Sequence, residues 1–354
     1  MSGDEVKITR LGYLAEKIVI VDGLPGCGKT MLSPIIAALE RAELLTYTYE
    51  IEYICALYFL KKVTADAALN LVRLFTDERI YHAMMSRETN FRPSDLSSVF
   101  RDARSLRYIK RLFQEGDKAI PERIKRERPI LHLATHNLLA FSEPVFLGLD
   151  NRVVFVEVVR HPLYMVKQQA INMESLIYDP RDLTIYFEYK DKQLPYYVRG
   201  WEELFISSNQ IEKSIYFIER LTSLKDRVKA QLEDNYNARI ITIPFESFVV
   251  EPWPYLKKLE VMLETKVTSV TRRAMKRQNV PRKMYAEGIG LNVYKRYGWH
   301  PPKSGASENS ELESRRNFVL QYASPDAMAT LDRLCNDYET KYMNGVKRTG
   351  EHYE

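Results

Sequence analysis

Residues 18–30 read Ile-Val-Ile-Val-Asp-Gly-Leu-Pro-Gly-Cys-Gly-Lys-Thr, an apolar run that leads directly into the pattern G-x-x-x-x-G-K-T. The β-branched run predicts a buried strand, and the glycines predict a loop whose backbone N–H groups turn inward around an anion. Lys29 adds a cation, and Thr30 adds a hydroxyl that can ligate a metal ion. The stretch therefore predicts a phosphate-binding loop, and the alternative is a glycine-rich turn without a ligand.

On this interpretation the whole loop and the start of the next helix contact a nucleotide. Cys27 is expected to be a small filler inside the loop and not a nucleophile. The residues predicted to bind the nucleotide are Gly23, Leu24, Pro25, Gly26, Cys27, Gly28, Lys29, Thr30 and Met31.

Composition places the chain among ordinary globular proteins. It has 354 residues, of which 45% are hydrophobic, and three widely spaced cysteines, which favour a reducing compartment over a disulfide framework. We find no secretory signal and no apolar run long enough to span a membrane, so we expect a cytoplasmic protein. The formal net charge of +5 is mild, and nucleic-acid binding is not implied. Basic residues cluster at 123–128 and at 272–283. The part at 272–277 is interpreted as a solvated helix face, or else as a site for anions.

Three further apolar runs predict buried parallel strands, at Ile130–Ala134, Val153–Val159 and Arg239–Ile243. With the first strand they predict an α/β protein, a three-layer P-loop fold with a central, mostly parallel sheet flanked by helices. Ligands bind at the carboxyl edge of such sheets. The polar residues after each run are therefore expected beside the phosphate loop: Thr135-His136-Asn137, Arg160-His161-Pro162 and Phe245-Glu246-Ser247.

We expect a single domain over 1–354, with helical insertions on the acceptor side at about 44–128 and 163–232. Ser94-Asp95 resembles an N-cap for a helix over 96–114. Residues 301–313 are rich in Pro, Gly and Ser and predict a mobile loop.

The polar stretch 86–93 interrupts the first insertion and is a candidate acceptor-binding loop. Its candidate contacts are Arg87, Asn90 and Arg92. The alternative is a well-capped connector between two helices.

The order of these motifs resembles the sulfotransferase family. The shared series is a strand with a phosphate loop near the start, Thr135-His136 after a strand, a later strand that ends in Arg160-His161-Pro162, and the segment 240–248 followed by Pro252. A basic and aromatic segment at 294–299, which includes Arg296, extends the resemblance loosely. Each motif is short, so the inference depends on their order and spacing across most of the chain.

The resemblance implies the donor 3′-phosphoadenosine 5′-phosphosulfate, with Lys29 and the loop on the phosphosulfate and Arg160 on the 3′-phosphate. It implies that His136 is the base that takes the proton of an acceptor hydroxyl, a role that a neutral imidazole can perform near pH 7. Without a ligand, His136 would be a capped histidine at a strand end, and Arg160 would pair with Glu157 or Asp332. The acceptor would be a small or carbohydrate-like molecule, and the oligomeric state is not indicated.

Two positions depart from the family pattern. Gly26 stands where the family usually has a lysine or arginine, and Gln168 stands in place of the usual serine. Lys29 is able to replace the missing cation, and Gln168 or Lys167 to donate to a 3′-phosphate.

The complete G-K-T pattern also fits a magnesium- and ATP-dependent kinase. In that alternative Thr30, with Glu157 or Asp22, would hold the metal ion. A nucleotide-binding protein without turnover is the third hypothesis.

Overall fold

The computed structural model describes residues 6–95, 97–175, 177–287 and 307–343. The whole of 288–306, which includes Arg296 and the basic and aromatic segment 294–299, lies outside these ranges. The strands are β1 (Lys17–Asp22), β2 (Thr46–Tyr47), β3 (Ile130–Ala134), β4 (Val153–Val159), β5 (Tyr186–Tyr189), β6 (Lys192–Pro195) and β7 (Ile240–Pro244).

Five of the strands form one parallel sheet in the order β2-β3-β1-β4-β7. In β3 and β4 every residue is buried, as expected for strands that are covered on both faces. Because β1 lies between them in parallel, Val19 pairs with His132 on one side and Val154 on the other. The α/β prediction and the strands expected from the apolar runs are confirmed.

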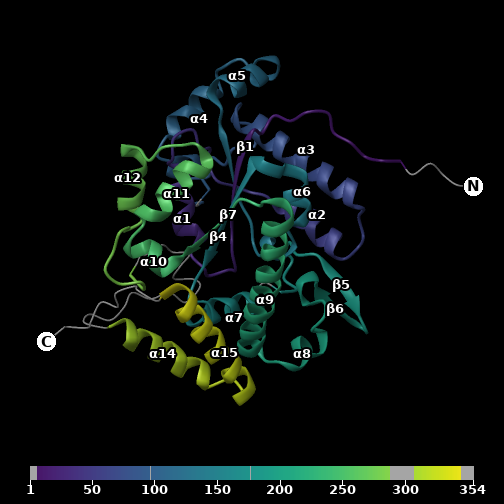
Figure 1. The fold of residues 1–354 in the computed structure, drawn as a ribbon, viewed down its shortest axis with the longest axis vertical. Helices are drawn as coiled ribbons and strands as arrows, with labels where there is room; N and C mark the ends of the chain where they lie inside the picture. Colours follow the sequence, from purple (N-terminus) through teal and green to yellow (C-terminus); the bar gives the residue numbers. More distant parts are fainter. Residues whose placement is uncertain (1–5, 96, 176, 288–306, 344–354) are drawn as a thin grey trace, which may run out of the picture.

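Helices cover both faces of the sheet (Figure 1). On one side lie α1, α10, α11 and α12, and on the other lie α2, α3, α6 and the long α9. The bounds are α1 (Lys29–Ala37), α2 (Tyr49–Phe59), α3 (Ala65–Ala83), α4 (Ser105–Arg111), α5 (Ile120–Glu127), α6 (Glu143–Leu149), α7 (Val166–Ser175), α8 (Glu202–Ser207), α9 (Gln210–Tyr236), α10 (Phe245–Val250), α11 (Trp253–Leu263), α12 (Ser269–Arg277), α14 (Glu308–Leu320) and α15 (Pro325–Tyr338).

The insertions are not purely helical, which corrects the sequence prediction. Residues 44–128 contain the edge strand β2 as well as helices, and 163–232 contain the antiparallel hairpin β5–β6. Tyr186–Tyr189 is rich in aromatic residues, which pack well on a pleated surface, and this local preference outweighs its helical surroundings. The predicted helix over 96–114 is also wrong, since only the short η1 (Val99–Arg101) and α4 form there.

The predicted mobile loop over 301–313 is wrong from residue 307 onward. The side chain of Ser307 accepts a hydrogen bond from the backbone N–H of Ser310, and this capping box starts α14 at Glu308. Residues 301–306 lie outside the described ranges.

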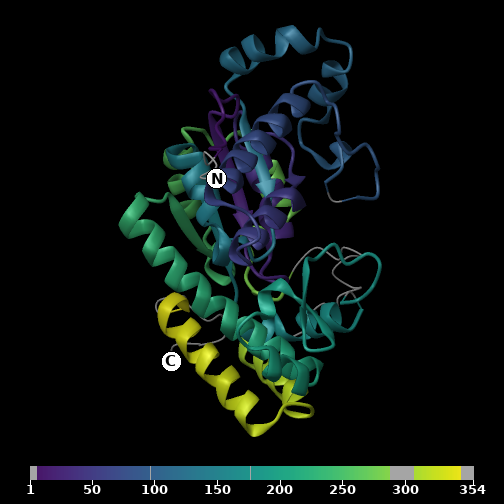
Figure 2. The same ribbon diagram turned by 90° about the vertical axis from the view of Figure 1, so that its right-hand side faces the viewer.

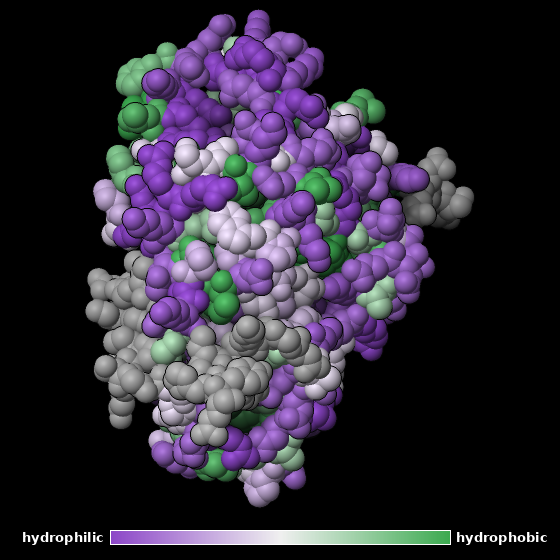
Figure 3. Space-filling view, turned by 60° about the vertical axis from the view of Figure 1, so that its left-hand side comes forward, coloured by the Kyte–Doolittle hydropathy of each residue, from purple (hydrophilic) through white to green (hydrophobic). Residues whose placement is uncertain are grey.

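The described residues include no helix with the length and apolar character needed to cross a bilayer. In Figure 2, α9 and α15 run side by side below the sheet, and α4 and α5 lie at the opposite end of the molecule. The face in Figure 3 is mostly hydrophilic, with apolar residues scattered across it.

Candidate functional site

The phosphate loop joins β1 to α1 and depends on glycine at three positions. Gly23, Gly26 and Gly28 have φ values of 149°, 90° and 105°, which side chains of L-residues rarely adopt. A Cβ atom at Gly23 would overlap the carbonyl oxygen of Val158, and one at Gly28 would overlap the ring of Phe245. The loop is therefore folded tightly against the ends of β4 and β7, where only glycine fits.

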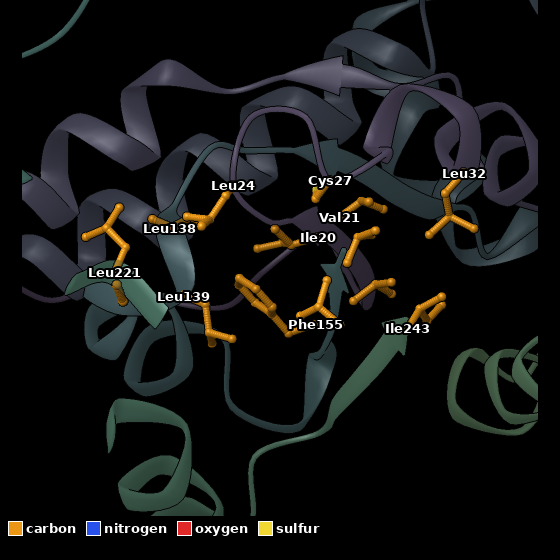
Figure 4. Packing of buried hydrophobic residues seen from close by; sticks show 14 of the residues in the cluster. Ile20, Val21, Leu24, Cys27, Leu32, Leu138, Leu139, Phe155, Leu221 and Ile243 are labelled. Carbon is orange, nitrogen blue, oxygen red and sulfur yellow. The ribbon is translucent and has the colours of Figure 1, made fainter. Parts of the chain in front are cut away.

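Two apolar side chains anchor the loop to the core. Figure 4 shows Leu24 pointing from the loop toward Leu138 and Cys27 pointing toward Val21, and both side chains are buried. Burial raises the pKa of the Cys27 thiol, which agrees with its interpretation as a filler. The two side chains thus fix the loop, and any contact of these residues with a ligand would come from their backbone.

Lys29 begins α1, and its ammonium donates a hydrogen bond to the carbonyl of Gly23 in the same loop. The side chain is buried at the positive end of the helix dipole, with no acidic residue in the first turn. An anion held by the loop would therefore meet a cation and several backbone N–H groups together.

The loop lines one side of a cavity of about 590 Å³. The ends of three other strands reach the same cavity, with His136 and Asn137 after β3, Arg160 after β4, and Phe245 after β7. The structure thus brings together the phosphate loop, the expected base and the expected arginine, as the carboxyl edge of a parallel sheet requires.

Arg160 lies between two aromatic rings. Its guanidinium carbon is 4.2 Å from the ring centroid of Phe245 and 4.9 Å from that of Tyr164, and Nη1 donates to the carbonyl of Gly26 at 3.0 Å. Burial lowers the pKa of Arg160, and Glu246, at 3.9 Å from Nε, opposes this shift. Stacking of this kind holds the planar fork in one orientation, which suits recognition of a phosphate.

The partners expected for Arg160 in the absence of a ligand lie elsewhere. Glu157 binds Lys225 at 2.6 Å, and Asp332 binds Arg316 at 2.7 Å. Glu246 instead joins loops, because it accepts hydrogen bonds from the backbone of His161 at 3.2 Å and from the hydroxyl of Tyr338 at 2.5 Å.

His136 has a carboxylate partner that the sequence analysis did not identify. Oε1 of Glu52, on α2, lies 3.2 Å from Nδ1 of the ring and accepts the backbone N–H of His136 at 3.0 Å. The rings of Tyr47 and Tyr49 lie nearly parallel to the imidazole, at interplanar angles of 7° and 14°, with centroids 6.0 Å away. The side chain of His136 is 33% exposed, so the ring is held in place while still open to the cavity.

Amide side chains from α7 face the phosphate loop. Gln168 lines the cavity, with its Oε1 beside Gly26, and Gln169 donates to the carbonyl of Pro25 at 2.7 Å. Lys167 lies instead over the ring of Phe318, at 5.4 Å, and does not line the cavity. Of the two donors considered for a 3′-phosphate, only Gln168 is near the loop.

The remaining wall of the cavity is rich in tyrosine and apolar residues, which come from β2, α2, α7, the segment between α7 and β5, the segment after β6, and α9. Burial raises the pKa of the Tyr197 hydroxyl in this wall. The residues of this wall are Tyr47, Tyr49, Tyr53, Met173, Ile177, Leu183, Ile185, Tyr196, Tyr197 and Phe217.

The candidate acceptor contacts from the 86–93 loop do not line this cavity. Arg87 lies near Asp117, at 3.7 Å, and Arg92 near Asp95, at 3.7 Å. Asn90 donates to Asp95 at 3.1 Å. These contacts are those of a connector, because they satisfy neighbouring loops on the surface.

The carboxylates considered as magnesium ligands are used within the fold. Asp22 accepts the hydroxyl of Thr135 at 2.9 Å and the backbone N–H groups of Leu138 and Leu139 at 3.0 and 2.9 Å. Burial by itself raises the pKa of Glu157, but Lys225 and Lys229 lower it to about 2. Neither carboxylate lines the cavity beside Thr30.

The sequence analysis did not single out a second arginine near the phosphate loop, Arg282. Arg282 lines the cavity, lies over Phe245 at 5.2 Å, and donates to the carbonyl of Tyr285 at 2.7 Å. Arg282 belongs to the basic stretch 272–283, and this was the signal that the sequence offered. A run of basic residues does not indicate which of them folds back toward the phosphate loop.

Several solved sulfotransferase structures are similar to the chain at low sequence identity. The sulfotransferase domain of the curacin biosynthetic pathway has 12% identity and a TM-score of 0.44, over 94% of this chain and 99% of that one. Sulfotransferase STF9 from Mycobacterium avium has 13% identity and a TM-score of 0.42, over 93% and 77%. Mouse sulfotransferase SULT7A1, complexed with PAP, has 12% identity and a TM-score of 0.35, over 93% and 87%.

These structures carry the name of the family that the motifs in the sequence resemble. No protein-family model matches the chain, and no curated protein matches its sequence.

Proposed function

We propose that this protein is a sulfotransferase that moves a sulfuryl group from 3′-phosphoadenosine 5′-phosphosulfate to a hydroxyl of a small acceptor. The observation that supports the proposal is the single cavity lined by the phosphate loop, by Arg160 and by His136. The donor end is cationic and rich in backbone N–H groups, as a molecule with phosphates at both the 3′ and 5′ positions requires.

Bound in the loop, the donor supplies an activated sulfuryl group whose sulfur–oxygen bond to phosphate breaks as the acceptor oxygen bonds to sulfur. His136 takes the hydroxyl proton at Nε2. Lys29 and the loop N–H groups stabilise the charge that develops on the departing phosphate oxygen. Arg160, oriented by Phe245 and Tyr164, holds the 3′-phosphate.

The acceptor half of the cavity favours a molecule with a flat or apolar body. Its wall of tyrosines and aliphatic residues offers stacking surfaces such as those on which rings bind. We therefore propose that the acceptor is a small ring-containing alcohol or phenol, or a sugar whose apolar face packs on this wall.

One observation favours a kinase instead, namely the complete G-K-T sequence with Thr30 on the cavity wall. The engagement of Asp22 and Glu157 by buried donors and lysines weakens this alternative, since each carboxylate would have to give up those partners to hold a metal ion.

A thermal-shift titration separates the hypotheses. Adenosine 3′,5′-bisphosphate without magnesium is expected to raise the melting temperature of the wild type, because a ligand that binds only the folded state stabilises it. Lys29→Ala should abolish that shift, and Lys167→Ala, outside the cavity, should retain it. Stabilisation only by ATP with magnesium would overturn the proposal in favour of the kinase. Binding of the bisphosphate without transfer to any of a panel of phenols and sugars would favour a non-catalytic protein.

A further inference from the structure

The contact between Glu52 and His136 fixes where the imidazole proton resides. An ionised carboxylate only accepts hydrogen bonds, so the ring nitrogen that faces Glu52, Nδ1 at 3.2 Å, must carry the proton. A neutral imidazole has one N–H, and Nε2 is then left with a lone pair. Among the described residues no hydrogen-bond partner of Nε2 is found, and the ring lines the cavity.

The local sequence explains why the carboxylate stands at this place. α2 begins two residues after β2, and Glu52 lies in the first turn of the helix, where the helix dipole favours a negative charge. Its oxygen accepts both the backbone N–H and the ring of His136, which restrains the residue from two sides. The rings of Tyr47 and Tyr49, from the same segment, lie nearly parallel to the imidazole and further restrict its orientation.

His161 has a carboxylate partner too, but it lies away from the cavity. His161 also follows a strand and also meets a carboxylate, Glu339 at 3.2 Å. Its side chain, however, is only 2% exposed, and it does not line the large cavity. Among the histidines that the structure describes, only His136 combines a carboxylate partner at one ring nitrogen with a place on the cavity wall.

We propose that Glu52 is a positioning residue for His136, which selects the Nδ1–H tautomer and thereby keeps Nε2 ready to receive a proton. This inference rests on the proposed function only for the reaction in which Nε2 takes part. The tautomer itself is a property of the free protein, so it is measured without donor or acceptor.

The direct test is nitrogen NMR of protein labelled with ¹⁵N-histidine, with His136→Ala used to identify the signal of His136 among the six histidines. In the neutral wild type, Nδ1 should appear protonated and Nε2 unprotonated. In Glu52→Ala the signal should move toward the Nε2–H form, which free imidazole side chains favour. An unchanged tautomer in Glu52→Ala overturns the inference.

Two further variants sharpen the test. Glu52→Gln keeps an acceptor oxygen for both N–H groups and should retain the wild-type tautomer, which also guards against a folding defect in the alanine variant. Glu50→Gln is the matched control. The carboxylate of Glu50 lies on the same helix, binds Arg79 and does not line the cavity, so its removal should not change the tautomer of His136. A change in Glu50→Gln as large as that in Glu52→Ala would overturn the inference, since a general loosening of α2 would then be the cause.

The kinetic consequence is a split between turnover and binding. In Glu52→Ala, kcat for sulfuryl transfer should fall about 10- to 100-fold, while the affinity for adenosine 3′,5′-bisphosphate stays within about twofold. A tautomer shift in a protein that transfers no sulfuryl group would support the positioning role and count against the proposed function. A kcat unchanged in Glu52→Ala, in a protein that does transfer it, would overturn the positioning role alone.

Discussion

The ring of Phe245 packs against Gly28 so closely that Cδ2 and Cε2 occupy the place where a Cβ atom would stand. The same ring lies under the guanidinium of Arg160 at 4.2 Å and that of Arg282 at 5.2 Å. One aromatic side chain at the end of β7 therefore sets the shape of the phosphate loop and the position of two cations. The packing here joins the loop to the proposed 3′-phosphate site.

Gly28→Ala should destabilise the protein more than its positive φ alone explains. Gly200 is the matched control, because its φ is 96° and no atom lies within 4 Å of an added Cβ. We expect Gly200→Ala to cost about 1 kcal/mol and Gly28→Ala about 2–4 kcal/mol in urea unfolding, since only the latter displaces the ring. Equal losses in the two variants would mean that the ring moves aside without cost.

Arg160→Lys should weaken binding of adenosine 3′,5′-bisphosphate by about 10- to 100-fold by calorimetry, although the charge beside Glu246 is kept. The reason is that lysine lacks the planar fork that stacks between Phe245 and Tyr164 and forms paired hydrogen bonds. Adenosine 5′-phosphate, which has no 3′-phosphate, should bind the two proteins alike. If the affinity for the bisphosphate does not change, Arg160 serves the fold and not the ligand.

His136→Ala should lower kcat by about 10²- to 10⁴-fold and leave donor binding intact, because a general base acts on the acceptor proton and not on the phosphates. His82→Ala is a suitable control, since His82 contacts Glu88 at 3.1 Å and does not line the cavity. Steady-state kinetics with a fixed acceptor would measure both. Full activity in His136→Ala would refute the assignment of the base.

His132 should make stability depend on pH. It is fully buried in β3, and burial lowers its pKa from 6.5 to about 3, although the backbone of Glu43 weakly opposes this shift. Above pH 6.5 the folded and unfolded chains both hold it neutral, so it adds no pH dependence. Below that pH the unfolded chain binds a proton that the folded chain does not, and stability falls by about 1.4 kcal/mol per pH unit until the folded pKa is reached.

His132→Leu removes this dependence. Urea unfolding at about pH 7.5 and about pH 5.5 should show a loss on acidification that is smaller in the variant than in the wild type by about 1.4 kcal/mol. Parallel losses in the two proteins would show that His132 is already protonated, or hydrated, in the folded state.

The strands and the tight glycine-rich loop after β1 could be predicted because their signals are local. A β-branched run followed by closely spaced glycines has few alternatives, and the three later apolar runs lie within one residue of β3, β4 and β7. The helix over 96–114 and the loop over 301–313 failed for the opposite reason. The composition of these two segments suggested a helix and a loop, but tertiary packing and the capping box at Ser307 decided where helices form.

By itself the sequence determined that a parallel sheet carries a glycine-rich loop after its first strand, with His136 and Arg160 at the carboxyl ends of two further strands, because periodicity and chain order fix which edge those residues reach. Only the tertiary structure decided that Glu52 accepts hydrogen bonds from His136, 84 residues away in the sequence, and that the ring of Phe245 lies under Arg160. It also decided that the carboxylate of Asp22 accepts hydrogen bonds from backbone N–H groups. Such contacts join residues distant in the chain, and their distances depend on how helices pack on the sheet, which no local pattern encodes.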